Sequence, residues 1–420
     1  MHEKATHQQT RTYNRQLVLR TIFDYGTLSR ADVARLTQLT PVTVSELVAE
    51  LLADQLVSEL DLHASGELAL PTKRGRRPIL LQVAASSRQL IALRLAVHEF
   101  RAALLDLNGE ILYSKSLAVG PARGQEAVQQ LTALTDELVA HATQPILGIG
   151  VASPGIVDTQ SGTVRRSVFF GWNNLPIGKL LHERYQRPVH VANASQVAAL
   201  AEYLFGSNRT LRNLAVLRVG QDVGAGLILD GQLFFGDGFG AGEIGHMVVD
   251  PQGERCACGN FGCLETQVSS QAMVRQAQAL AATAPDSQLA RALAAASSPA
   301  LEAVVEAFRA GDPLAAQLVQ ANARYVSQAV AALVALLNIQ QIRLVGSITQ
   351  FGTAWLEAVR AALPGTAIPD LVGQTTLEIA EHGSDAVILG AAALLLSREL
   401  GLTLSRYQEP RGQPRGGGAL

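Results

Sequence analysis

The chain has 420 residues, of which 48% are hydrophobic, 17% are charged and 5% are aromatic, and its formal net charge is −2. This composition is typical of a globular protein of two or three domains and excludes a disordered chain. A net charge so close to zero excludes a protein that is basic throughout, so any contact with nucleic acid must be local. The start MHEKATHQQT is polar, and no apolar run reaches the ~18 residues of a membrane span. We therefore expect a cytoplasmic protein that is not inserted in a membrane.

The first part of the chain predicts three short helices. Apolar residues between Arg15 and Tyr25 lie on one helical face. Ser29 is followed three residues later by Asp32, which is the spacing of a capping box at the start of a second helix. Thr40 can cap a third helix whose first residue is Pro41, where the missing N–H of proline has no cost. Two short helices joined by a tight turn are typical of a DNA-binding helix-turn-helix.

The first turn of the third helix is expected to contact bases in a major groove. Its small polar side chains are not needed for packing, which falls to apolar residues further along the helix. The predicted contacts are Thr40, Pro41, Thr43 and Ser45.

A β-hairpin is predicted after the third helix, with strands near residues 56–60 and 79–83. Its basic loop is expected to enter a minor groove or to bind phosphates. The residues concerned are Lys73, Arg74, Arg76 and Arg77. Residues 1–83 therefore predict a winged helix-turn-helix that binds double-stranded operator DNA. The alternative is that the three helices only pack on the body and the loop is a solvated turn.

The rest of the chain predicts an α/β body of two lobes. Short β-like runs separated by Gly-rich turns extend to about residue 250, and Ala-rich helical sequence follows residue 266. Leu314 to Leu337 predicts a long buried helix, and Ile342 to Val345 predicts a strand. We expect a first lobe from residues 84–195 plus about 385–404, and a second lobe from 196–384 that also carries dimerisation helices. The Gly/Pro/Arg-rich tail at 405–420 is expected to be disordered.

A compact group of potential metal ligands lies near the middle of the chain. The three cysteines of the chain fall within eight positions, and a histidine precedes them. Three thiolates and one imidazole are the ligand set of a closed, tetrahedral structural Zn²⁺ site with no open position for catalysis. The predicted ligands are His246, Cys256, Cys258 and Cys263. The alternative is three ordinary buried thiols.

These residues resemble the signature of a known family. The run Gly242-Glu-Ile-Gly-His246, followed by the cysteines and Leu264-Glu265, closely resembles the ROK family of repressors, open reading frames and kinases. The segment Val249–Glu265 is especially similar to that of bacterial repressors of glucose and N-acetylglucosamine uptake genes. The resemblance implies an actin-like, hexokinase-like body with a sugar cleft between its lobes, preceded in the repressor branch by a winged helix.

The resemblance also predicts that kinase chemistry is lost. The first phosphate loop of family kinases falls on Arg94 to His98, where its aspartate and glycines are absent. The second falls on Gly220-Gln-Asp222, and we expect the anionic Asp222 to repel ATP. The catalytic base falls on Ala194, whose methyl group cannot accept a proton from a sugar hydroxyl. We therefore expect that the chain is not an enzyme.

The sugar-recognition positions of the family are retained better. They correspond to Asn193, Glu243, His246 and Glu265, whose amide, carboxylates and metal-bound imidazole suit sugar hydroxyls. The alternative is that these side chains are structural and only cap helices or bond to the zinc loop.

We therefore predict a transcriptional regulator, a repressor of carbohydrate uptake or metabolism genes, controlled by a sugar or phosphosugar. One alternative is a ROK sugar kinase that retains a DNA-binding domain, and another is a repressor controlled by a protein partner. A single winged helix reads only a short half-site, so we expect a homodimer or higher homo-oligomer on a near-palindromic operator.

Overall fold

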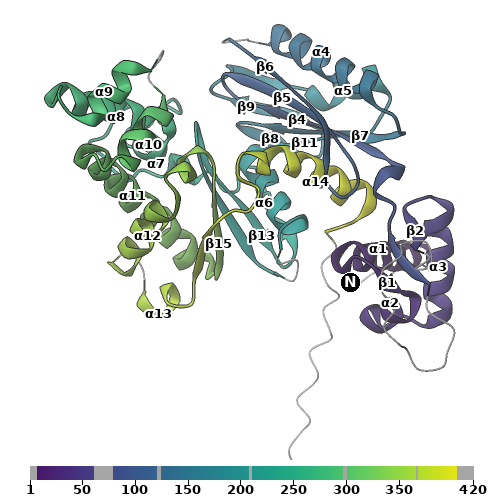
Figure 1. The fold of residues 1–420 in the computed structure, drawn as a ribbon. Coiled ribbons are helices and arrows are strands. Elements are labelled where there is room, and N and C mark those ends of the chain that lie inside the picture. Colours follow the sequence, from purple (N-terminus) through teal and green to yellow (C-terminus); the bar gives the residue numbers. More distant parts are fainter. Residues whose placement is uncertain are drawn as a thin grey trace, which may run out of the picture.

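The computed structural model describes residues 7–60, 79–120, 124–207, 211–296, 300–365 and 368–403. Figure 1 shows a small N-terminal unit beside two larger α/β lobes. The predicted tail at 405–420 and the basic loop lie outside the described residues. Within the described ranges, no helix is both long and apolar enough to span a bilayer.

The N-terminal unit combines three helices with a three-stranded sheet in the order β1-β3-β2. The predicted capping box is confirmed, because the Ser29 hydroxyl accepts from the backbone N–H of Asp32 and the Asp32 carboxylate accepts from that of Ser29. The Thr40 side chain caps the third helix as predicted. The elements are α1 (His7–Tyr25), β1 (Leu28–Ser29), α2 (Arg30–Thr37), α3 (Pro41–Ala53), β2 (Val57–Leu60) and β3 (Leu80–Val83).

The first helix begins well before the apolar face that predicted it. It starts at His7, and Arg11 and Arg15 form ion pairs with Glu50 and Asp54 of the α3 end. These contacts between α1 and α3 give the polar N-terminal turns partners that a search for apolar periodicity does not detect.

The first lobe is built on a five-stranded sheet in the order β11-β7-β4-β5-β6. Its strands β4, β5 and β6 form an antiparallel meander, and β7 and β11 add in parallel. The strands are β4 (Gln89–Leu95), β5 (Glu99–Leu105), β6 (Ile111–Ala118), β7 (Ile146–Ser153) and β11 (Val189–Asn193), and the helices are α4 (Gln125–His141) and α5 (Ile177–Tyr185). A small side sheet contains β8 (Ile156–Asp158), β9 (Thr163–Ser167) and β10 (Trp172–Leu175).

The second lobe repeats this arrangement with the order β14-β13-β12-β15-β16. Again a meander of three antiparallel strands is followed by two parallel ones. The strands are β12 (Leu214–Val219), β13 (Val223–Leu229), β14 (Gln232–Leu233), β15 (Gln341–Val345) and β16 (Thr376–Ile379). The helices are α7 (Leu264–Val268), α8 (Ser270–Thr283), α9 (Gln288–Ala295), α10 (Leu301–Arg309), α11 (Pro313–Leu337), α12 (Gly352–Ala362) and α13 (Pro369–Val372). The predicted long helix and the strand after it are confirmed as α11 and β15.

Two helices join the lobes. They are α6 (Ala194–Leu204) and α14 (Ala386–Leu400), which pack on each other where the two sheets approach (Figure 1). Their close approach requires Gly390, because a Cβ atom there would lie 2.0 Å from the carbonyl oxygen of Val197. The boundary predicted at residues 195–196 falls inside α6, and the division into lobes by residue number stays a prediction.

The N-terminal unit packs against the C-terminal ends of these two helices. Apolar residues of α1 and α3 belong to the same hydrophobic cluster as those of α6 and α14. Phe23 of α1 lies 6.3 Å from Phe205, the C-cap of α6, and the Arg20 guanidinium lies 5.2 Å from the Tyr203 ring centroid. The N-terminal unit is therefore packed on the body, and its position depends on α6 and α14.

Candidate functional site

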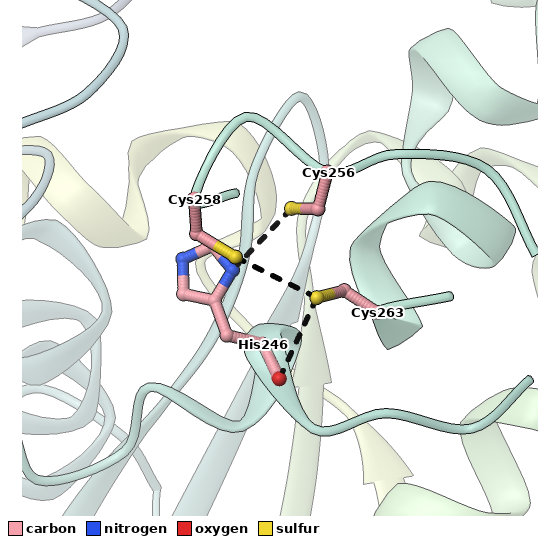
Figure 2. Close-up of side chains that lie close together, drawn as sticks. All are labelled: His246, Cys256, Cys258 and Cys263. Carbon is pink, nitrogen blue, oxygen red and sulfur yellow. Dashed lines mark hydrogen bonds between the residues drawn. The ribbon is translucent and has the colours of Figure 1, made fainter. Parts of the chain in front are cut away.

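Four potential metal ligands converge beside the second sheet. Figure 2 shows His246 and the three cysteines pointing toward one another, and their ligand atoms all lie within 4.8 Å of each other. The Cys258 Sγ lies 3.7 Å from the Cys263 Sγ, and the Cys256 Sγ lies 3.6 Å from the His246 Nδ1. A tetrahedral ion with ligands at ~2.0–2.3 Å has ligand–ligand edges of roughly 3.5–3.8 Å, so the group can hold such an ion.

The loop that carries the cysteines folds back because of one glycine. Gly262 has a φ of +65°, and a Cβ atom there would lie 1.4 Å from the carbonyl oxygen of Asp250. Only glycine fits this position without moving the backbone. The turn brings Cys263, at the N-cap of α7, back beside His246, whose carbonyl accepts from the Cys263 thiol at 3.6 Å.

The four predicted sugar-binding residues line one small cavity of about 40 Å³. The Asn193 Nδ2 donates to the Glu243 Oε1 at 3.2 Å, and the Glu265 Oε2 accepts from the backbone N–H of Val223 at 3.0 Å. The Nε2 of His246 lies 3.7 Å from the Glu243 Oε2. The histidine therefore faces the cysteines with one nitrogen and the cavity with the other.

The cavity residues also have structural contacts. Asn193 is the N-cap of α6, and its Oδ1 accepts from the backbone N–H of Ser195 at 2.7 Å. Burial raises the pKa of Glu265 to about 7 and also raises the pKa of Glu243. Asn193 and Glu265 therefore have structural contacts, as the alternative of purely structural side chains predicted. Glu243 and the Nε2 of His246 line the cavity, where a ligand could reach their polar atoms.

A larger cleft of about 950 Å³ lies next to this cavity. Residues 94–98, at the end of β4 and in the turn to β5, line it. Residues 220–222, in the turn between β12 and β13, line it as well. Ala194 at the start of α6 lines it too. The positions that the resemblance assigned to two phosphate loops and a catalytic base are therefore brought together at one cleft.

The expected repulsion of ATP by Asp222 is wrong in its physical reason. Asp222 forms an ion pair with Arg218, which also donates to the Ser195 hydroxyl at 3.1 Å. Although burial by itself would raise the pKa of Asp222, the Arg218 guanidinium holds that pKa below its usual range. The neighbouring guanidinium thus neutralises the carboxylate, and sequence spacing alone could not reveal this partner.

The first turn of α3 presents most of its predicted DNA contacts to solvent. Thr40, Pro41 and Ser45 are exposed, whereas Thr43 is half-buried and its hydroxyl lies 2.9 Å from that of Thr40. Sequence reasoning did not consider Val42, a residue of the same turn that is 67% exposed. The sequence indicated this exposure, because the apolar residues at 44, 47, 48 and 51 already form the buried face of α3. The other predicted contacts, Lys73, Arg74, Arg76 and Arg77, lie outside the described residues.

Comparison with known proteins places the chain in a family. A sequence profile of the ROK family matches residues 90–398. The chain belongs to the ROK family. A xylose repressor from Caldicellulosiruptor bescii is 29% identical over 399 residues, covering 94% of this chain and 98% of the repressor.

Two solved structures of this family differ in how much of the chain they cover. A ROK family transcriptional regulator, a homologue of the Escherichia coli Mlc protein, superposes with a TM-score of 0.80 at 28% identity and covers 94% of this chain and 98% of its own. A ROK glucokinase from Streptomyces griseus, solved with glucose and AMPPNP, gives a TM-score of 0.68 at 26% identity and covers 73% of this chain and 98% of its own. The body is thus shared by regulators and kinases, and the N-terminal unit is shared with the regulator.

Proposed function

We propose that the chain is a DNA-binding transcriptional regulator, a repressor of carbohydrate uptake or metabolism genes, controlled by a sugar or sugar phosphate bound in its body. The observation that carries this proposal is the N-terminal unit. The glucokinase match spans nearly all of that enzyme yet only 73% of this chain, whereas the regulator match spans 94% of it. What the chain adds to a kinase-like body is a unit of three helices with a small three-stranded sheet.

The geometry of the N-terminal unit supports DNA binding through a winged helix-turn-helix. Helices α2 and α3 are joined by three residues, and α3 presents an exposed first turn suited to a major groove. The antiparallel pair β2–β3 flanks the loop that contains Lys73, Arg74, Arg76 and Arg77, which we assign to the wing. Val42 adds an apolar surface that can pack on a thymine methyl group.

The body is proposed to bind a sugar and a structural Zn²⁺ ion. His246, Cys256, Cys258 and Cys263 would hold the ion, which would order the loop and orient the imidazole. The Nε2 of His246 would then face sugar hydroxyls together with Asn193, Glu243 and Glu265. Because all four metal ligands come from the chain, the ion has a structural rather than a catalytic role.

Phosphoryl transfer is not part of the proposal. Ala194 offers no proton acceptor at the cleft, and Arg94 stands where the family resemblance places the metal-side aspartate. These two positions argue against the alternative of a sugar kinase that also binds DNA.

The test is selection of duplexes from a randomised DNA pool with the purified full-length chain. We expect enrichment of a near-palindromic sequence, since a homodimer would place one winged helix on each half-site. Failure to enrich any sequence, with folded and zinc-loaded protein, would overturn the proposed function. Release of the selected duplex by a monosaccharide or sugar phosphate would then separate control by a small molecule from control by a protein partner.

A further inference from the structure

One residue in the loop between β14 and the small cavity has an unusual backbone conformation. Phe239 has a φ of +62°, in the left-handed region. Seven non-glycine residues in the described part of the chain have a positive φ, and the six others are Gln, Asn or Asp. A bulky aromatic residue is rarely found there, and glycine occupies both neighbouring positions of the chain. Glycine would form this turn with less strain, so the phenyl ring must have a role that the turn itself does not require.

The backbone around Phe239 is held from the start of α6. The Gln196 Nε2 donates to the carbonyl oxygens of Phe239 and Ala241, at 3.2 and 3.3 Å. Gln196 is only 1% exposed and lies three residues after Asn193, the N-cap of α6. The loop then continues to Glu243, which lines the small cavity. Gln196 thus fixes the middle of the loop relative to the cavity and offsets part of the backbone strain.

The ring of Phe239 faces the other lobe. The Arg165 guanidinium, on β9 of the first lobe, lies 5.6 Å from the Phe239 ring centroid, within the range of a cation–π contact. The Asp158 carboxylate at the end of β8 pairs with Arg165 at 2.7 Å and also accepts from the backbone N–H of Gln160 at 3.1 Å. Because Asp158 already orients the guanidinium, less side-chain entropy is lost when Arg165 contacts the ring.

The contact connects the two walls of the small cavity. On the side of the first lobe, the turn between β9 and β10 lines the cavity. On the side of the second lobe, Glu243 and His246 line it, and both follow the loop that carries Phe239. Neither Arg165 nor Phe239 lines the cavity itself. The two residues can therefore act on the cavity only through the elements that they connect.

We propose that Arg165 and Phe239 form a clasp between the two lobes, and that Phe239 is a positioning residue that holds Glu243 and His246 toward the small cavity. When the clasp opens, this ring no longer ties the loop to the first lobe, and the two walls of the cavity can separate. A ligand that contacts both walls should then bind more weakly, although neither residue of the clasp touches it. The effect on a sugar rests on the proposed function, whereas the clasp itself does not.

The test of the clasp is amide hydrogen exchange of the full-length protein, measured by mass spectrometry without ligand or DNA. A cation–π contact at a partly exposed site corresponds to a factor of about two to five in an equilibrium. Phe239→Leu and Arg165→Gln should therefore each speed exchange in residues 234–246 about two- to fivefold. The double variant should exchange no faster than the faster single variant, because both substitutions break the same contact. Phe239→Tyr keeps the aromatic face and should retain the protection.

Arg166→Gln is the matched control, because Arg166 is an exposed arginine of the same strand whose side chain lies on the opposite face from that of Arg165. It should leave the exchange of residues 234–246 unchanged. Unchanged exchange in both Phe239→Leu and Arg165→Gln would overturn the clasp, and so would equally fast exchange in Arg166→Gln. Leucine keeps the left-handed strain of the backbone, so faster exchange in Phe239→Leu reports on the ring.

Calorimetry with glucose, xylose and N-acetylglucosamine tests the positioning role. Phe239→Leu and Arg165→Gln should bind a sugar about two- to fivefold more weakly than the wild type, and Phe239→Tyr should bind it like the wild type. Equal affinity in the wild type and both clasp variants would overturn the positioning role for a sugar, as would binding of none of the three sugars by the wild type. A parallel titration with the selected duplex separates the two proposals, since intact DNA binding would leave the proposed function standing.

Discussion

The imidazole of His246 connects two sites through its two nitrogens. Its Nδ1 lies 3.6 Å from the Cys256 Sγ, and its Nε2 lies 3.7 Å from the Glu243 Oε2 in the small cavity. A metal bound to one nitrogen fixes both the tautomer and the orientation of the other. Sugar affinity is therefore expected to depend on the metal although the metal need not touch the sugar.

Replacing Cys258 with serine tests the metal group. The wild-type chain should contain about one zinc per molecule by elemental analysis, and Cys258→Ser should lose it. Because a structural ion contributes several kcal/mol to folding, the midpoint of thermal unfolding should fall by roughly 10 °C. Removing zinc from the wild type with a chelator should reproduce the same shift. Zinc-free wild-type protein with an unchanged melting temperature would contradict the assignment.

A kinase assay tests the substituted residues of the cleft. The wild-type protein should not phosphorylate glucose or N-acetylglucosamine with ATP above background. Ala194→Asp should not restore turnover, because Arg94 still occupies the cleft where a metal-binding carboxylate is required. Turnover by the wild type that co-purifies with the protein through successive columns would show that the chain is an enzyme.

Some residues of the candidate site could be predicted from the sequence, and others could not. The cysteines and His246 were predictable, because their chemistry and spacing are specific, and the structure brings all four together. The Arg218–Asp222 pair was not, because no sequence pattern indicated which cation would face the carboxylate across the turn between β12 and β13.

At the scale of elements, α6 links the small cavity to the N-terminal unit. Its N-cap is Asn193 in the cavity, and its C-cap is Phe205, which packs near Phe23 of α1. Every residue of α6 is buried, so the helix is confined along its whole length. A shift of α6 on ligand binding would therefore reach α1 and would connect the proposed effector site with the N-terminal unit.

The packing of α6 on α14 can be tested with one methyl group. In Gly390→Ala the new Cβ atom would meet the backbone of Val197, which must move, so the free energy of unfolding should fall by about 1–3 kcal/mol. Gly238→Ala is the matched control, since no atom lies within 4 Å of its Cβ position. Chemical denaturation should show a lower midpoint for the first variant and little change for the second. Equal midpoints for Gly390→Ala and Gly238→Ala would show that the close packing of α6 on α14 does not contribute to the stability of the fold.

The α3 turn and the assigned wing should give different signatures on DNA. Val42→Ala removes two methyl groups worth ~0.8 kcal/mol each, so it should weaken operator binding roughly tenfold and leave scrambled DNA unaffected. Arg76→Ala and Arg77→Ala should weaken both duplexes and reduce the log–log salt slope by about 0.9 for each phosphate that the variant no longer neutralises. Anisotropy titrations at several salt concentrations distinguish the two patterns. Wing variants that behave like wild type on both duplexes would show that the loop is a solvated turn.

At the scale of the whole molecule, the body consists of two sheets with one topology. Sequence patterns predicted strands, helices and two lobes, and the family resemblance supplied the hexokinase-like fold class. The internal repetition was missed, although Leu93-Arg-Leu95 of β4 and Leu217-Arg-Val219 of β12 occupy matching positions. The repeat is hidden because the second lobe inserts the helices α7 to α11 between β14 and β15, and because buried strands tolerate many apolar substitutions.

As a transcriptional repressor, the whole molecule must recognise a specific DNA sequence. The most direct measurement is an anisotropy titration of the full-length, zinc-loaded protein on its selected duplex and on a scrambled duplex of equal length, repeated at several salt concentrations. We predict that the selected duplex binds about 1,000-fold or more tightly than the scrambled one, and that both affinities fall as salt rises. Equal affinity for the two duplexes at every salt concentration would show that the protein does not recognise a specific DNA sequence.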